Sequence, residues 1–177
     1  MLRKFHPFCH ATSIYDIDIN FFKKLNIKYL FTDLDNTLDS YRCYDPSQRA
    51  KDLVKALKDI GVTTIIISNN TGQRVKAYSE RLGVEWTHSM GKPFSRKLKA
   101  FIKERNINPE EVIMVGDQMI TDIRCANGAK LKSILTDKIV KEDQWTTHIN
   151  RFFERPYRKH CMKKHKFKEW GEIYGQS

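Results

Sequence analysis

The chain lacks the features that mark a secreted or membrane-spanning protein. Its 177 residues contain only four cysteines, none of them in a Cys-x-x-Cys pair, so neither a disulfide framework nor a paired-ligand zinc site has support. Its apolar runs fall short of the ~18 residues that are needed to span a bilayer. Residues 1–13 hold basic side chains but no apolar segment like that of a secretory signal. We therefore expect a cytoplasmic protein with reduced thiols.

Acidic residues are scarce relative to basic ones, since 21 Asp and Glu oppose 32 Lys and Arg and the net charge is +11. Seven basic residues and no acidic ones lie between 155 and 168, interleaved with Tyr157, Met162 and Phe167. Such a segment favours contact with anionic lipid headgroups or with nucleic acid phosphates. The alternative is a solvated tail that only aids solubility. We accordingly expect one folded domain, 1–154, followed by a basic C-terminal tail, 155–177.

The hydrophobic pattern is typical of an α/β domain. A hydrophobic content of 40% suits a single globular core. Short apolar runs alternate with segments of helical periodicity, an arrangement that predicts a parallel sheet with right-handed crossovers. The expected strands are 27–31, 62–67, 84–87, 112–115 and 132–135, and the expected helices are 46–60, 73–82, 95–105, 121–127 and 143–153. A short helix capped by Asp18 or Asn20 precedes the first strand.

Two aspartates follow the first strand directly. Asp33 and Asp35 are separated by one residue, and carboxylates this close repel each other unless a cation lies between them or one of them keeps a proton. A hard divalent ion such as Mg²⁺ takes oxygen ligands and would suit them. The alternative is that the pair merely caps a turn, because Asp and Asn are common where strands end.

Further polar residues lie at the ends of later strands. Ser68 and Asn69 follow the second strand, where they either bind an anionic oxygen or make a turn. Gly116 permits a tight exit from the fourth strand and delivers Asp117 and Asp122 to the same edge. Ligands of open α/β sheets bind beyond the carboxyl ends of the strands. Lys92 by itself is typical of a surface lysine. It becomes a candidate site residue only together with these other motifs.

Taken in order, these motifs resemble the four signature motifs of the haloacid dehalogenase-like (HAD) phosphatase superfamily, and they span about residues 28–135. The motifs are Asp33-Leu34-Asp35, Ser68, Lys92, and Gly116-Asp117 with Asp122. Within the superfamily the chain resembles subclass IIIA and the YqeG family, which is related to phosphatidylglycerophosphate phosphatases. The residues that carry this closer resemblance are Ser13-Ile14-Tyr15-Asp16-Ile17, Ser68-Asn69-Asn70, Gly91-Lys92-Pro93 and Asn150-Arg151.

The resemblance implies a fold and a set of roles. The fold is a Rossmann-like three-layer sandwich with a parallel five-stranded sheet in the order 5-4-1-2-3, and the short segments between the motifs leave no cap domain. Asp33 is implied to be the nucleophile that forms an aspartyl-phosphate, and Asp35 to be the proton donor and acceptor. The implied Mg²⁺ ligands are Asp33, the backbone carbonyl of Asp35, and Asp117. Ser68, Asn69 and Lys92 are implied to bind the phosphate, while Asp122 supports Lys92 or a metal-bound water.

A site without a cap points to a substrate that is large or presented on a surface. We therefore expect a Mg²⁺-dependent phosphomonoesterase that acts on phosphatidylglycerophosphate, in peripheral contact with the inner face of an anionic membrane. One alternative is a phosphatase that acts on nucleic acid ends or phosphoproteins. Another is a non-catalytic RNA- or ribosome-binding module.

Overall fold

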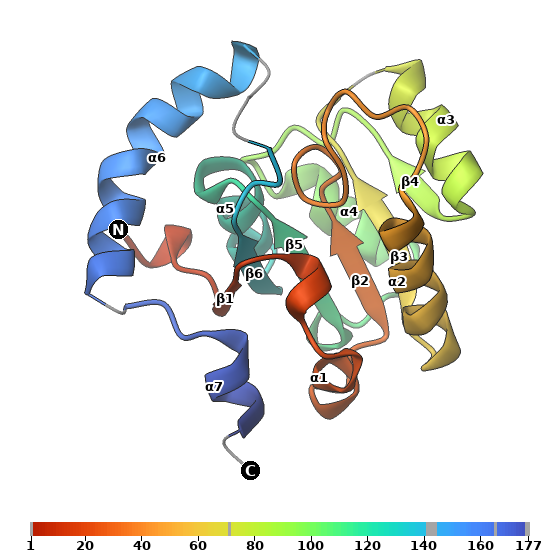
Figure 1. Ribbon diagram of the computed structural model, residues 1–177, viewed down its shortest axis with the longest axis horizontal. Helices are drawn as coiled ribbons and strands as arrows, with labels where there is room; N and C mark the ends of the chain where they lie inside the picture. Colours follow the sequence, from red (N-terminus) through yellow and green to blue (C-terminus); the bar gives the residue numbers. More distant parts are fainter. Residues whose placement is uncertain (1, 71, 141–144, 165, 176–177) are drawn as a thin grey trace.

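The computed structural model, which describes residues 2–70, 72–140, 145–164 and 166–175, is built on one parallel sheet (Figure 1). The strands lie in the order β1-β6-β5-β2-β3-β4, and every neighbouring pair is parallel. Their bounds are Cys9–Ala11 (β1), Tyr29–Thr32 (β2), Thr63–Ile67 (β3), Glu85–Thr87 (β4), Val112–Gly116 (β5) and Lys132–Thr136 (β6). The expected α/β class and its parallel sheet are confirmed.

Within the described residues the sheet has six strands, so the expectation of five was wrong by one. The five expected strands are β2 to β6, and they occur in the expected relative order. The additional strand, β1, pairs with β6 at the edge, with Cys9 opposite Ile134. β1 is only three residues long and fully buried, so it is too short to show the alternation by which a strand is recognised in a sequence.

Helices cover both faces of the sheet and make the sandwich three layers thick. One face packs against α1 (Ile19–Lys24), α2 (Gln48–Asp59) and α3 (Gln73–Leu82), and the other against α4 (Arg96–Glu104) and α5 (Arg124–Gly128). Asp18 caps α1 by accepting a hydrogen bond from the Asn20 amide at 2.8 Å, as expected. α2 begins later than expected, because Ser47 is its N-cap and accepts from the Ala50 amide at 3.3 Å.

The C-terminal segment packs against the domain. α6 (Trp145–Lys163) runs well past 153, where the last helix was expected to end, and crosses the expected boundary at 154; residues 143 and 144 of the expected helix lie outside the described residues. Cys161 and Phe167 are buried against Met119 and Leu135. α7 (Trp170–Gly175) places the Trp170 ring 5.8 Å from that of Phe21. Figure 1 shows both helices on the β1 side of the sheet.

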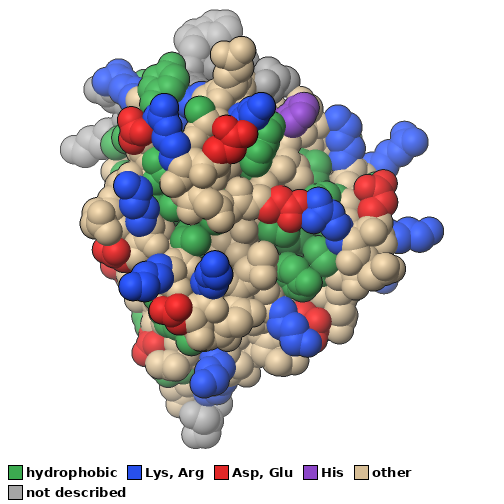
Figure 2. All heavy atoms as spheres, turned by 90° about the vertical axis from the view of Figure 1, so that its right-hand side faces the viewer, with side chains coloured by type: hydrophobic (Ala, Val, Ile, Leu, Met, Phe, Trp, Pro, Cys, Tyr) green, Lys and Arg blue, Asp and Glu red, His purple; other side chains and the backbone are tan. Residues whose placement is uncertain are grey.

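The surface of the described residues carries both signs of charge. Figure 2 shows the face with α2 and α3, where Lys and Arg side chains are interspersed with Asp and Glu. In the described part of the chain, no helix is both long enough and apolar enough to traverse a bilayer.

Candidate active site

The first and fourth motifs meet because their strands are neighbours. Thr32 of β2 lies opposite Val115 of β5, and the Asp33 amide donates to the Val115 carbonyl at 2.9 Å. The segments that follow β2 and β5 therefore leave the sheet at the same end. Asp33, Asp117 and Asp122 are all buried, and each offers a carboxylate oxygen within 4.8 Å of the other two.

Gly116 makes room for Asp122. A Cβ added at Gly116 would lie 2.4 Å from the Asp122 Cγ, so only glycine fits this position. The wide helical turn Met119–Ile123 brings Asp122 back under the strand end, where its Oδ2 accepts from the Gln118 amide at 3.1 Å.

Lys92 is a buried cation that pairs with two of these three carboxylates. Its Nζ donates to Asp33 Oδ1 and Asp122 Oδ1, both at 2.7 Å, and to the Ile67 carbonyl at 2.9 Å. Burial works to lower the pKa of Lys92, but the two carboxylates outweigh it and raise that pKa above its ordinary value. Lys92 is therefore charged, although only 6% of it is exposed.

Asn69 fixes the backbone of Lys92. Its Nδ2 donates to the Lys92 carbonyl at 2.7 Å, and its Oδ1 accepts from the Lys92 amide at 2.8 Å. In this structure both ends of the amide hold the lysine in place. The phosphate-binding role implied for Asn69 stays a prediction.

The donor set fits a divalent cation. Burial raises the pKa of Asp33 to about 6, with Lys92 opposing this rise and Asp122 adding to it. Ionised, the three carboxylates outnumber the single ammonium of Lys92. Buried charge of one sign is stable only when it is compensated. Clustered carboxylate oxygens are the ligands that Mg²⁺ takes.

Asp35 forms an ion pair with Arg74, a residue that was not predicted from the sequence to belong to the site. The Arg74 guanidinium forms an ion pair with Asp35 Oδ1 and also donates to the Cys43 carbonyl at 2.7 Å. Arg74 lies in the first turn of α3, the helix that follows Ser68. A basic residue that opens a helix after a motif strand is the signal that could have found it.

Ser68 lies at the strand end where it was expected. It is buried, and its Oγ accepts from the Asn70 amide at 3.0 Å, so it makes the turn contact that was the alternative to phosphate binding. That hydroxyl keeps its own proton for donation to an anionic oxygen.

α6 holds the loop of the fourth motif at two points. Arg158 donates from Nη1 to the Asp117 carbonyl at 2.9 Å, and from Nη2 to the Thr136 carbonyl at 2.8 Å and to Asp137 Oδ1 at 2.6 Å. Glu154 Oε1 accepts from the Ile120 amide at 2.6 Å. Neither residue was expected to serve the site, because the sequence places them at the end of the domain and in the basic tail. The side chains of Asn150 and Arg151 lie outside the described part of the chain.

Comparisons with known proteins agree with this geometry. Residues 89–154 match the HAD-hydrolase-like family model. The chain is 31% identical over 156 residues to the "Probable phosphatase YqeG" of Bacillus subtilis, and the match covers 88% of this chain and 91% of that protein.

Solved structures share the fold. The cobalt-bound deoxy-D-mannose-octulosonate 8-phosphate phosphatase of Haemophilus influenzae matches with a TM-score of 0.51 at 17% identity, over 64% of this chain and 70% of that one. An uncharacterized protein of Listeria monocytogenes matches with a TM-score of 0.54 at 17% identity, over 67% and 85% of the two chains. At these identities the likeness concerns the fold alone. The extended similarity to YqeG shows that the chain belongs to the HAD-like phosphatases, in the family of that protein.

Proposed function

We propose that this enzyme is a Mg²⁺-dependent phosphomonoesterase that acts, through an aspartyl-phosphate, on a lipid of the phosphatidylglycerophosphate type. The observation that carries the proposal is the convergence of the buried carboxylates of Asp33, Asp117 and Asp122, two of which, Asp33 and Asp122, are paired with the Nζ of Lys92. The substrate would lie at the inner face of a membrane, with the enzyme in peripheral contact.

The proposed metal ligands are the carboxylates of Asp33 and Asp117 and the backbone carbonyl of Asp35. Bound there, Mg²⁺ would mask the negative charge of the phosphate and so allow an anionic nucleophile to approach it. Asp122 holds Lys92 at 2.7 Å and is thereby assigned to support. The solved structure of the Haemophilus influenzae phosphatase is a cobalt-bound form. The carboxylates proposed here as ligands would likewise suit a divalent ion.

The residues divide the chemistry into two steps. Asp33 Oδ attacks phosphorus, the bond to the leaving oxygen breaks, and Asp35 gives that oxygen a proton. Asp35 then takes a proton from the water that attacks the aspartyl-phosphate, and this second step releases phosphate and restores Asp33. Lys92 and the Ser68 hydroxyl stabilise the charge on the transferred phosphoryl group.

Before the reaction, Asp35 is held in an ion pair with Arg74. Asp35 must leave Arg74 before it can carry a proton to the leaving oxygen. A guanidinium binds phosphate oxygens as well as it binds a carboxylate. We infer that the incoming phosphate takes over Arg74 and frees Asp35.

Two features support a lipid substrate. The stretch from Asp35 to Ser68 forms a loop, α2 and β3, and the stretch from Ser68 to Lys92 forms α3 and β4. These described segments belong to the sandwich itself and do not form a cap over the site, which suits a substrate that is large or presented on a surface. Phe94, two residues after Lys92, is 69% exposed, and the Arg124 guanidinium lies 5.8 Å from its ring centre. An exposed aromatic ring beside a cation suits the interface of an anionic bilayer.

Release of phosphate from phosphatidylglycerophosphate vesicles, compared with phosphorylated oligonucleotides and phosphopeptides in the presence of Mg²⁺, tests the proposal. We expect kcat/KM to favour the lipid and Asp33→Asn to abolish turnover. A preference for the oligonucleotide or the peptide would overturn the lipid assignment while leaving the phosphatase intact. Absence of turnover on all three would instead favour a non-catalytic binding module.

A further inference from the structure

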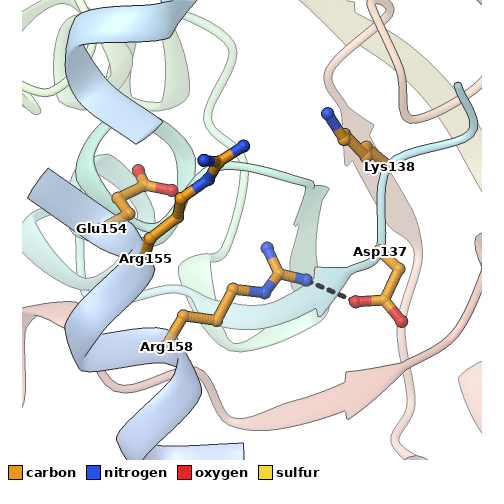
Figure 3. A pocket seen from close by; sticks show the side chains of 5 residues that line it. All are labelled: Asp137, Lys138, Glu154, Arg155 and Arg158. Carbon is orange, nitrogen blue, oxygen red and sulfur yellow. Dashed lines mark hydrogen bonds and ion pairs between the residues drawn. The ribbon is translucent and has the colours of Figure 1, made fainter. Parts of the chain in front are cut away.

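In the described part of the chain, two acidic side chains outside the acidic cluster of the site are buried, Glu154 and Asp39. Glu154 lies on α6 (Figure 3) and accepts from the Ile120 amide at 2.6 Å, so it serves the loop of the fourth motif. Asp39 lies in the loop of the first motif, four residues after Asp35, and has no role in the chemistry described above. Because a buried carboxylate is costly unless its oxygens are bound, the partners of Asp39 indicate what it does.

The side chain of Asp39 is bound from two helices. Its Oδ2 accepts from the hydroxyl of Tyr78 on α3 at 2.6 Å and from the amide of Ser47, the N-cap of α2, at 2.9 Å. Its Oδ1 lies 3.7 Å from a guanidinium nitrogen of Arg49. Tyr78 is fully buried. Burial raises the pKa of its hydroxyl far above the ordinary value, and the hydrogen bond to Asp39 raises that pKa further. The hydroxyl therefore keeps its proton and acts as the donor.

The backbone of Asp39 holds the residues on both sides of Asp35. Its carbonyl accepts from the Asn36 amide at 2.8 Å, and its amide donates to the Leu34 carbonyl at 3.3 Å. A parallel bridge also joins Asp39 to Asp35. Asp39 thus closes the turn that carries Asp35, while its side chain ties that turn to α3.

α3 contacts the same turn a second time, through Arg74. Arg74 and Tyr78 are four residues apart on α3, so their side chains lie on one face of the helix. Arg74 pairs with the Asp35 carboxylate, and Tyr78 binds Asp39. Once an incoming phosphate takes over Arg74, the bond between Tyr78 and Asp39 is the contact by which α3 still holds the turn.

We propose that Tyr78 and Asp39 are positioning residues, which hold Asp35 where it can give its proton to the leaving oxygen. The inference rests on the proposed phosphatase function and concerns the proton transfer in its first step. Neither side chain belongs to the acidic cluster, so both act through the turn of Asp35. A small displacement of a catalytic group is enough to slow the step that it serves.

Tyr78→Phe tests the proposal, because it removes the hydroxyl and keeps the buried ring. The measured quantities are kcat/KM for an alkyl phosphate and for a nitrophenyl phosphate. Both report the steps up to departure of the leaving group, and only the alkoxide needs a proton from Asp35 as it leaves. We expect the variant to lower kcat/KM for the alkyl phosphate about tenfold, through kcat rather than KM, and to change that for the nitrophenyl phosphate by less than about twofold.

Two further variants sharpen the test. Asp39→Asn keeps an oxygen that can accept from both Tyr78 and Ser47, so it should retain most of the wild-type ratio of the two kcat/KM values. Tyr44→Phe is the matched control, since it removes the hydroxyl of an exposed tyrosine in the same loop and should leave the ratio unchanged.

The ratio of the two kcat/KM values decides the outcome. A ratio that Tyr78→Phe leaves unchanged, whether both values fall together or neither falls, would overturn the positioning role and leave Tyr78 a part of the fold alone. A loss in Asp39→Asn as large as that in Tyr78→Phe would overturn it as well, because the hydrogen bond would then not be what positions Asp35. If wild type hydrolyses neither substrate, the proposed function itself fails and this inference fails with it.

Discussion

Lys92 lies between two carboxylates, and all three groups are buried away from water. Only 6% of Lys92 and 1% of Asp122 are exposed, so the partners depend on one another for compensation of their charge. Two uncharged residues position Lys92 and Asp122: Gly116 leaves room for Asp122, and the side-chain amide of Asn69 binds both the N–H and the carbonyl of Lys92. At the scale of single residues, the site is therefore sensitive to changes at positions that carry no charge.

Gly116→Ala should displace Asp122, because the new Cβ would lie 2.4 Å from its Cγ. We expect a loss of about 1–3 kcal/mol in the free energy of unfolding, as is usual for overpacking, together with a fall in kcat because Lys92 loses a partner. Urea unfolding and aryl phosphate kinetics measure the two effects. Gly171→Ala is the control, since an added Cβ there meets no heavy atom within 4 Å. Equal behaviour of both variants would contradict the crowding at Gly116.

Arg74→Gln should slow hydrolysis about a hundredfold, because the phosphoryl group loses a guanidinium that stabilises its charge. The loss should be similar for an alkyl phosphate and for a nitrophenyl phosphate, because Arg74 binds the phosphate and not the leaving group. Arg81→Gln on the same helix removes an exposed cation paired with Asp45 and should change neither rate. A clearly larger loss on the alkyl phosphate would mean that Arg74 instead orients Asp35 for proton transfer to the alkoxide.

At the scale of elements, α6 connects the basic segment to the loop of the fourth motif. Its Glu154 and Arg158 bind the backbone at Ile120 and Asp117, while its Cys161 is buried in the core. Contacts to the groups behind a metal ligand orient that ligand. The helix therefore serves the site although none of its described side chains lies in the acidic cluster.

If Asp117 is the metal ligand proposed above, Arg158→Lys should raise the Mg²⁺ concentration that gives half-maximal activity about tenfold, the lower end of the range for residues behind a metal ligand. Lysine keeps the charge but cannot make the three forked hydrogen bonds of the guanidinium. Faster amide hydrogen exchange across residues 117–122 would report the loosened loop independently of activity. Lys159→Gln changes an exposed neighbour on the same helix and should match wild type. An unaltered Mg²⁺ requirement in Arg158→Lys would show that the loop holds its own shape.

At the scale of the whole molecule, His10 joins the two ends of the chain. Its backbone amide donates to the Lys168 carbonyl at 2.8 Å, its Nδ1 lies 2.9 Å from Glu169 Oε1, and its Nε2 lies 3.4 Å from Asp137 Oδ1. Burial works to lower the pKa of His10, but the hydrogen bonds to Asp137 and Glu169 outweigh burial and raise that pKa above 6.5. The folded protein therefore binds this proton more tightly than the unfolded chain does.

A raised pKa in the folded state stabilises the protein below the unfolded pKa of 6.5, and this stabilisation is lost as the pH rises through the folded value. His10→Gln should therefore lower the Tm more at a pH of about 5.5 than at a pH of about 8.5. Thermal unfolding of wild type and variant at both pH values measures the difference. A deficit that is the same at both would mean that His10 contributes through packing rather than through its charge.

The sequence predicted the parts of this molecule that depend on neighbours in the chain. The apolar run before Asp33 and the glycine before Asp117 mark strand ends, and the sheet order then brings those ends together. Roles that depend on distant segments could not be seen. Arg158 is 41 residues from Asp117, and nothing local to either residue indicates their contact. β1 was missed for a related reason, since its place is set by pairing with β6 and not by a pattern of its own.

The pairing of β1 has one more consequence. Its outer side is met by the C-terminal segment, through the hydrogen bond from His10 to Lys168 and a parallel bridge between His10 and Glu169. An uncovered outer strand presents main-chain donors and acceptors to which another polypeptide can add. Removal of the residues after 163 would lay this margin bare, and the shortened protein should self-associate through it, so that the last residues act as a guard against polymerisation.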